Sequence, residues 1–533
     1  MQWLRPAFAF LLVALVYFYR IDRPLLWPDE ADTGLAARTI LRHGYPAACD
    51  GRNVYIEENG HILNKNLVFC VSPWIQFYLG AASLFLFGNN TLGLRILFVV
   101  CGVLSFFPIY AIVRTRLHYP SVLAGLILVS PQILLFQRNA RYYPLLILLY
   151  AMLVWHLLRN FKSPRNRFLS AMLIFILLFH THSFAAMCAS ISLIVFCLFF
   201  RREVLASYFF ACGIGFASWL IWHQALGPRL APAELFISIA KTGFTLWFKM
   251  FCISLWATIV DMDAVDCFPI LLWVLILAVL LIRGGDALRN LFRDRLYAFV
   301  FLNIVIQVVA GAALFGFETN SHHSFFRYAP HLLVFALLAL FMTLNTAVSD
   351  RKVRLFVCIF AVVFNFLTIS FWTKPLGRRV PASWLLPVYS DIFRPPENAW
   401  DVVVSRMDSE SKIAPGRATV MASLPSWTGE DAIFYLGDRY LIYPLLHAPA
   451  VECEQSIRKV MGEQAFNNLF QQPEWIVDCL EGLKPGPAGY ELVDVIPSYQ
   501  KNPDDGGRPE LTRHSFPQPI VVRGVRLFRL TKK

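Results

Sequence analysis

The feature that most constrains the fold is a series of apolar runs that fills the first two thirds of the chain. A transmembrane helix needs roughly 20 apolar residues to cross about 30 Å of hydrocarbon. Runs that reach or approach this length, several of them short, lie at residues 6–20, 92–113, 119–137, 143–158, 168–182, 184–200, 204–222, 267–282, 296–316, 328–346 and 354–372. The sequence therefore predicts a polytopic α-helical membrane protein with about eleven transmembrane helices. Its 57% hydrophobic and only 16% charged residues exclude a soluble protein.

The basic residues between these runs predict how the chain is oriented, because lysine and arginine concentrate in cytoplasmic loops. Two further apolar stretches, 67–87 and 235–260, are ambiguous by hydropathy alone. If neither crosses and the N-terminus is cytoplasmic, nearly every basic cluster between spans lies on the cytoplasmic side. If 67–87 alone crossed, these clusters would all move outside. We therefore expect both stretches to lie at the interface as juxtamembrane helices. Topology also explains the net charge of +13 without a nucleic-acid partner.

This topology places residues 21–91 and everything after the last span outside. From about Thr373 prolines, acids and short alternating runs replace the long apolar blocks. Strands are predicted at Arg417–Ser423, Tyr440–Tyr443, Trp475–Cys479, Tyr490–Ile496 and Val522–Leu530, with a helix at Glu454–Leu469. The sequence thus predicts a transmembrane domain over residues 1–372 and a soluble α/β domain over residues 373–533.

Polar residues that could carry chemistry collect at the predicted outer ends of the helices. They are Asp29, Glu30 and Asp32 in the stretch Leu26-Trp-Pro-Asp-Glu-Ala-Asp-Thr-Gly34; Lys65 later in the same loop; Arg138, Arg141, Tyr142 and Tyr143 after the third span; His180 and His182 at the end of the fifth; and Arg327 with Tyr328 before the tenth. Arg138 and Arg141 are spaced i and i+3, so both can point to the same side of a helical turn. The bilayer midplane has almost no ionisable residue apart from His156, which lies towards a helix end. This weakens the case for an ion-coupled transporter.

This ordered set resembles membrane glycosyltransferases of the GT-C class, in particular the protein O-mannosyltransferase and lipid A aminoarabinose transferase superfamily. The features are an Asp-Glu pair after the first span, an Arg-Asn-Ala-Arg-Tyr-Tyr turn, an outer histidine and a later Arg-Tyr. The resemblance covers about residues 1–372, and Trp427–Leu436 is similar to segments of bacterial members. The chain departs from these relatives where they often carry a Lys- or His-Pro-Pro-Leu element. It has Val71-Ser-Pro-Trp74 there, and its lysine comes earlier, at Lys65.

The resemblance implies a sugar donor carried on a polyprenyl phosphate and inversion of the anomeric centre by an acceptor hydroxyl. Asp29 would then be the general base, and Glu30 would orient it or the acceptor. The implied contacts to the donor phosphate are Arg138, Arg141, Arg327 and Lys65, and the implied substrate contacts are Tyr142, Tyr143 and Tyr328. The acceptor could be a lipid, a glycan or a protein. The expected location is a bacterial inner membrane, with the site and the C-terminal domain facing the periplasm.

Each of these residues also has a simpler interpretation. Asp29 could be a solvated loop acid, Asp32 could cap a helix that begins at Thr33, and the two arginines could anchor to lipid headgroups. His180 and His182 could bind a divalent metal with acids of the first loop. Their i, i+2 spacing suits one helical face poorly, so hydrogen-bonded histidines at a helix end are favoured. The rival functions are a transporter or flippase of lipid-linked saccharides and a non-enzymatic scaffold for envelope assembly.

Overall fold

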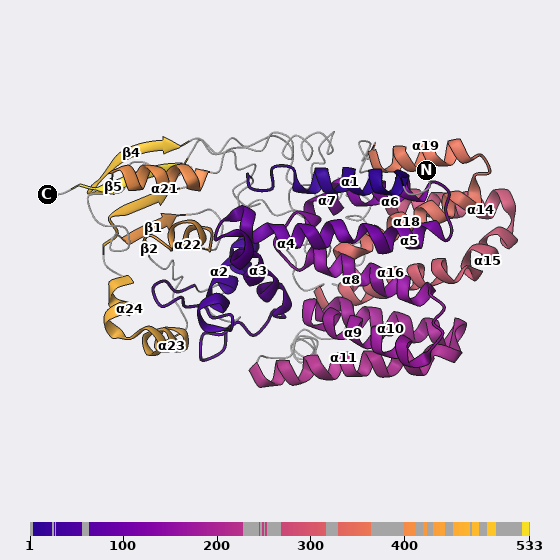
Figure 1. Ribbon diagram of the computed structural model, residues 1–533, viewed down its shortest axis with the longest axis horizontal. Coiled ribbons are helices and arrows are strands. Elements are labelled where there is room, and N and C mark those ends of the chain that lie inside the picture. Colours follow the sequence, from indigo (N-terminus) through magenta and orange to yellow (C-terminus); the bar gives the residue numbers. More distant parts are fainter. Residues whose placement is uncertain are drawn as a thin grey trace. The chain divides into compact units, whose positions relative to one another are not determined.

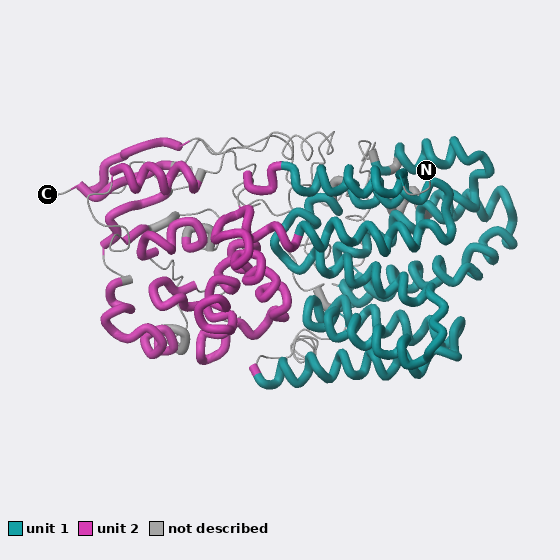
Figure 2. Tube along the Cα trace, in the orientation of Figure 1, with its two compact units in different colours: residues 1–19, 99–225, 229–389 teal, residues 20–98, 226–228, 390–533 magenta. Residues whose placement is uncertain are grey.

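The computed structural model divides into two compact units (Figures 1 and 2). Unit 1 comprises residues 1–19, 99–225 and 229–389, and unit 2 comprises residues 20–98, 226–228 and 390–533. The structure describes residues 4–23, 26, 28–55, 63–226, 245, 248–249, 251–252, 268–315, 329–363, 399–410, 419–423, 430–442, 451–469, 472–478, 488–496 and 525–531. The expected domain boundary at residues 372–373 lies outside these ranges, as does most of the stretch 235–260.

Unit 1 is a helical bundle. Its helices are α1 (Leu4–Phe18), α5 (Phe106–Arg114), α6 (Pro120–Val129), α7 (Pro131–Gln137), α8 (Tyr143–Leu158), α9 (Pro164–Thr181), α10 (Ser183–Phe200), the 3₁₀ helix η2 (Arg202–Val204), α11 (Leu205–Leu226), α14 (Phe268–Arg283), α15 (Gly285–Arg293), α16 (Arg295–Phe315), α18 (Pro330–Ala347) and α19 (Arg351–Val363). Helix α4 (Thr91–Leu104) begins in unit 2 and ends in unit 1.

Each of the eleven predicted spans contains one helix or a broken pair, with residues 364–372 of the last span outside the described residues, and the predicted helical membrane fold is confirmed. Among the described residues, five helical segments are long and apolar enough to cross a membrane: Thr91–Arg114, Ser183–Phe200, Arg202–Leu226, Arg295–Ala313 and Pro330–Ala347. The predicted span 119–137 is two helices, because Pro131 begins a new helix after the extended Ser130. Proline has no N–H to donate and fits the first turn of a helix.

Helix α18 forms the centre of unit 1. Its residues from Pro330 to Leu344 are buried without interruption, as expected for a helix that is apolar on all sides. It packs against α14, α16, α8, α6, α7 and α19. A helix surrounded in this way fixes the ends of its neighbours, including the turn that carries Arg138 and Arg141.

Unit 2 combines the first loop with the C-terminal region. Its helices besides the start of α4 are α2 (Pro28–His43), α3 (Ile75–Phe87), α21 (Ala399–Glu410), α22 (Glu430–Leu436), α23 (Val451–Met461) and α24 (Glu463–Leu469). Helix α2 packs against α3 and α22. At 13 residues, α3 is shorter than a transmembrane helix requires. The interfacial position expected for 67–87 stays a prediction.

The C-terminal sheet is mixed, in the order β2-β1-β3-β5-β4. Strands β1 (Thr419–Ser423), β2 (Leu441–Ile442), β3 (Trp475–Asp478), β4 (Tyr490–Ile496) and β5 (Val525–Leu530) coincide with the five predicted strands. β1 is parallel to β2 and β3, whereas β5 is antiparallel to β3 and β4. The predicted helix at 454–469 is instead the pair α23 and α24, divided at Gly462, whose φ of +84° suits glycine. Helices α21 and α22 were not predicted.

Candidate active site

The acidic stretch forms the first turn of α2 and is buried. The helix begins at Pro28, and Asp29 and Glu30 occupy its first turn, where the helix dipole stabilises negative charge. Asp29, Glu30 and Asp32 expose only 3%, 1% and 4% of their surfaces. A solvated loop acid is therefore the wrong description of Asp29. The expectation that Asp32 caps a helix starting at Thr33 is also wrong, because the helix starts five residues earlier.

Glu30 forms a buried, bidentate ion pair with Arg95. Arg95 Nε donates to Glu30 Oε1 at 2.8 Å, and Arg95 Nη2 donates to Glu30 Oε2 at 2.6 Å. Arg95 Nη1 also donates to the Ile21 carbonyl oxygen at 2.8 Å. The pair therefore ties the start of α2 to α4 and to the chain just after α1. Our sequence analysis missed Arg95, although a lone arginine inside an apolar run usually has a buried partner.

Asp32, the last acid of the stretch, also has a hydrogen-bond partner. The Tyr55 hydroxyl donates to Asp32 Oδ1, and Thr33 Oγ1 donates to the Asp29 carbonyl oxygen at 3.1 Å. Tyr55 in turn stacks on Phe69 at 5.4 Å between ring centroids. The backbone of Asp29 thus lies in a turn whose neighbours are fixed by hydrogen bonds and by packing.

The C-terminal segment Phe434–Ile442 packs directly onto this loop within unit 2. The Leu26 N–H donates to the Tyr435 hydroxyl at 3.0 Å, and Thr91 Oγ1 lies 3.2 Å from the same hydroxyl. Asn53 Nδ2 donates to the carbonyl oxygen of Gly437 at 2.9 Å, and Asn53 Oδ1 accepts from the Ile442 N–H at 2.8 Å. The segment that carries Tyr435 and Gly437 therefore helps to position the acidic turn.

A charged cluster reinforces this contact. Arg38 Nε donates to Asn89 Oδ1 at 2.6 Å, and its guanidinium lies 4.1 Å from the centre of the Phe434 ring. Arg38 Nη2 is 3.5 Å from Asp438 Oδ2, and Arg42 Nη2 is 3.8 Å from Asp438 Oδ1. Burial lowers the pKa of Arg38, and the charge of Asp438 opposes this effect. These side chains hold together α2, the α3–α4 turn, and α22 with the turn that follows it.

The sequence-predicted cations have different environments. Lys65 is exposed in unit 2, and Arg327 and Tyr328 lie outside the described residues. Arg138 in unit 1 donates to the carbonyl oxygens of Val16, Tyr17 and Tyr19 at 2.6, 3.0 and 2.8 Å. It therefore satisfies acceptors that the end of α1 leaves open.

Arg141 and the residues around it are buried in unit 1. The Arg141 guanidinium carbon lies 5.9 Å from the Tyr142 ring centre, and the Tyr142 and His182 rings are 4.6 Å apart. Tyr143 packs edge-on against Phe136 at 4.8 Å. Arg141, Tyr142 and His182 therefore form one contiguous group in unit 1.

Both predicted histidines have hydrogen-bond partners at helix ends. His182 Nδ1 accepts from the Ala185 N–H at 3.2 Å and so caps α10, and His180 Nε2 lies 3.3 Å from Ser218 Oγ. In the part of the chain that the structure describes, no group of three or more His, Cys, Asp or Glu side chains could hold a metal ion. The metal alternative stays a prediction.

A buried polar network in unit 1 was missed by the sequence analysis. Gln307 Nε2 donates to the Tyr150 hydroxyl and to Asn303 Oδ1, both at 2.9 Å, and Asn303 Nδ2 donates to Ser192 Oγ at 3.1 Å. The His331 ring stacks on Tyr150 at 4.2 Å between centroids. The sequence does carry a signal for such a network, because its polar residues lie about two turns or more inside apolar runs.

The chain resembles one protein family and several solved structures. Residues 71–222 match the dolichyl-phosphate-mannose-protein mannosyltransferase family, whereas no curated protein matches the chain. Among solved structures, the chain is 14% identical to ArnT from Cupriavidus metallidurans bound to undecaprenyl phosphate, over 88% of this chain and 92% of ArnT, with a TM-score of 0.48. It is 11% identical to the archaeal oligosaccharyltransferase AglB from Archaeoglobus fulgidus, in complex with an inhibitory peptide and a dolichol-phosphate, over 90% and 69% of the two chains, with a TM-score of 0.47. Residues 71–222 thus resemble the mannosyltransferase family, and the resemblance to the GT-C glycosyltransferases that the sequence analysis stated is confirmed.

Proposed function

We propose that the chain is an inverting glycosyltransferase that moves a sugar from a polyprenyl-phosphate donor to a lipid, glycan or protein acceptor. The observation that carries this proposal is the buried Asp29-Glu30 pair at the start of α2. The match of residues 71–222 to a family named for a dolichyl-phosphate sugar supports it. In the proposed reaction the acceptor oxygen bonds to the anomeric carbon while the bond to the phosphate oxygen breaks. The electron pair of that bond leaves with the polyprenyl phosphate.

Asp29 is our candidate for the base that takes the hydroxyl proton. This choice follows the resemblance to the GT-C glycosyltransferases. Asp29 shares its turn with Glu30, which accepts two hydrogen bonds from Arg95, and with Asp32, which accepts from Tyr55. Glu30 is better suited to positioning the turn that carries Asp29.

Cations must stabilise the departing phosphate. Arg141, Lys65 and Arg327 remain our candidates. Arg138 donates to three carbonyl oxygens at the end of α1, so we assign it mainly to holding the turn in which Arg141 lies. Tyr142, Tyr143 and Tyr328 are the proposed substrate contacts. We place this chemistry at the periplasmic face of a bacterial inner membrane.

The test is Asp29→Asn, with Asp22→Asn as the matched control. Asp22 lies in the same loop, but its side chain is 48% exposed and forms an ion pair with neighbouring Arg23. Cells lacking the gene are complemented with each variant, and their envelope glycans are compared by mass spectrometry. Loss of a general base lowers rates by roughly 10²–10⁴-fold. We therefore expect D29N, at normal protein levels, to leave glycans as in the deletion strain, while D22N restores them.

The rival flippase makes the opposite prediction for the same variants. A flippase should tolerate D29N and should move a lipid-linked saccharide across vesicle membranes without consuming it. Full restoration of the glycans by D29N would contradict the assignment of Asp29 as base. Glycans that are unaltered by deletion of the gene would contradict the proposed transfer as a whole.

A further inference from the structure

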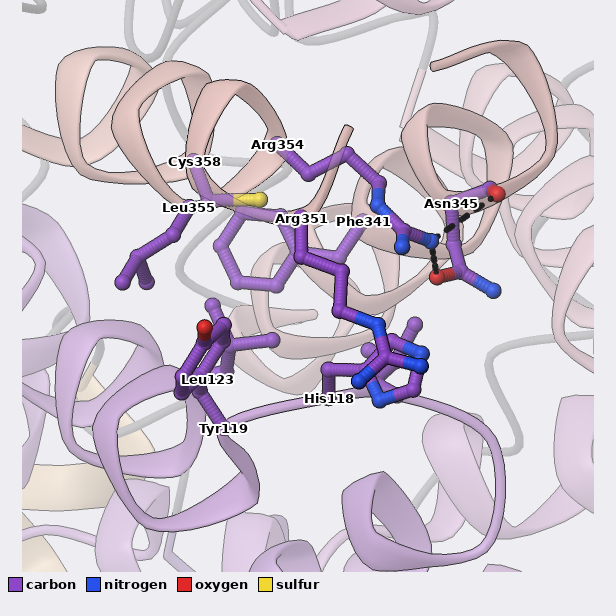
Figure 3. A pocket seen from close by; sticks show the side chains of 10 residues that line it. His118, Tyr119, Leu123, Phe341, Asn345, Arg351, Arg354, Leu355 and Cys358 are labelled. Atoms are coloured by element: carbon purple, nitrogen blue, oxygen red, sulfur yellow. Dashed lines mark hydrogen bonds between the residues drawn. The ribbon is translucent and has the colours of Figure 1, made fainter. Parts of the chain in front are cut away.

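A hollow lies in unit 1 where the α5–α6 turn meets the start of α19 (Figure 3). It is small and open to solvent on one side. Its lining comes from the α5–α6 turn and the start of α6 on one side, and from the two helices that flank the α18–α19 turn on the other. The topology predicted from the basic loops places both turns on the cytoplasmic side, opposite the site proposed for sugar transfer.

The lining is basic at the mouth and apolar below. His118, Arg351 and Arg354 contribute the basic groups, and none of the ten lining residues is an acid. Figure 3 shows the Arg351 side chain extending towards His118, with Leu123 and Leu355 on the other side of the hollow. This combination matches an amphiphile with an anionic head and an apolar body.

The basic groups are arranged before any ligand binds. Arg354 donates to the carbonyl oxygen of Asn345 at 3.2 Å and to its Oδ1, so its guanidinium is fixed. Asp350, which directly precedes Arg351 in the sequence, uses Oδ1 to accept from the N–H groups of Lys352 and Val353 at 2.8 and 2.9 Å. This carboxylate oxygen therefore caps α19.

The α5–α6 turn places His118 near two positive charges and holds Tyr119 in an unusual backbone conformation. Desolvation lowers the pKa of His118, and the positive charges of Arg351 and Arg354 lower it further. The adjacent Tyr119 has φ +56° and ψ +47°, a left-handed conformation that is strained for tyrosine and disfavoured before proline. The turn thus holds His118 and Tyr119 beside the hollow at a conformational cost, and an anion there would offset the charges of Arg351 and Arg354.

We propose that this hollow binds the phosphate headgroup of an anionic membrane phospholipid, with Arg351 and Arg354 on the phosphate and Leu123 and Leu355 against the start of the acyl chains. Arginine suits this role because its planar guanidinium donates two parallel hydrogen bonds to phosphate oxygens. The site is separate from the proposed glycosyltransferase chemistry and does not depend on it.

The test measures binding of dioctanoyl phosphatidic acid to the purified full-length protein by native mass spectrometry. Dioctanoyl phosphatidylcholine and inorganic phosphate are the comparison ligands. Arg351→Gln should weaken phosphatidic acid binding about tenfold, because a hydrogen bond to a charged group is lost. Arg289→Gln is the control, since Arg289 lies in the short helix α15 with 66% of its side chain exposed, and this variant should bind as the wild type does.

A second variant tests the apolar wall without altering charge. Leu355→Trp should fill the hollow and weaken phosphatidic acid binding while the melting temperature stays near that of the wild type. Equal affinity in the wild type and both variants would overturn the proposal. Equal binding of phosphatidylcholine would also overturn it, and inorganic phosphate binding as tightly as phosphatidic acid would replace the lipid site with a simple anion site.

Discussion

At the scale of single residues, three acids within four positions have different environments. Glu30 is paired with Arg95, Asp32 accepts from Tyr55, and Asp29 lies between the start of the helix and these fixed neighbours. The sequence could identify the cluster because three carboxylates beside an apolar span are unusual. It could not divide their tasks, since Arg95 and Tyr55 are 65 and 23 residues away from their partners.

The Glu30–Arg95 pair gives a prediction at this scale. Removing one member leaves a buried charge without its counter-ion, so Glu30→Gln or Arg95→Met should each destabilise unit 2 by about 3–5 kcal/mol. The double variant should cost less than the sum of the two single variants, because it leaves neither charge unpaired. Thermal unfolding of the purified protein measures all three. Additive losses would show that the two side chains do not interact.

At the scale of elements, local patterns identified the apolar helices and the strands but missed α21 and α22. Apolar runs and alternating strands carry their signal within a few residues, so the positions of α4 to α11 and β1 to β5 were predictable. Helix α22 is only seven residues long, and its partner α2 is about 400 residues earlier. Helix α2 itself has few strongly apolar residues, yet its positions 31–40 are all buried, because α3 and α22 cover it.

Gly34 tests the contact between α2 and α22. A Cβ atom at Gly34 would lie 2.4 Å from the Phe434 ring, whereas one at Gly213 in α11 would meet nothing within 4 Å. Gly34→Ala should therefore force the ring aside and destabilise unit 2 by about 1–3 kcal/mol. Gly213→Ala should be neutral or stabilising by up to about 1 kcal/mol, because alanine favours helix. Limited proteolysis of the C-terminal region measures the difference, and equal cleavage of the two variants would contradict the packing described.

At the scale of the whole molecule, unit 2 combines residues 20–98 with residues 390–533. The contacts responsible are between side chains hundreds of residues apart, such as Asn53 with Gly437 and Arg38 with Asp438. Such pairings have no local signature, which is why a single sequence indicates two regions outside the membrane but not their association. The association has a topological requirement, since both segments must lie on the same side of the membrane.

Epitope tags at Asn160 and Gly462 test this requirement in the intact chain. Both positions are exposed, Asn160 between α8 and α9 and Gly462 between α23 and α24. The predicted topology has seven crossings between them, an odd number, so the tags should lie on opposite sides. Antibody should reach Gly462 in spheroplasts with an intact inner membrane, and Asn160 only after permeabilisation. If both tags proved cytoplasmic, the C-terminal region would be inside, and Asp29 with it, because the two belong to one unit. A polyprenyl-phosphate donor used at the outer face could then not reach the proposed base.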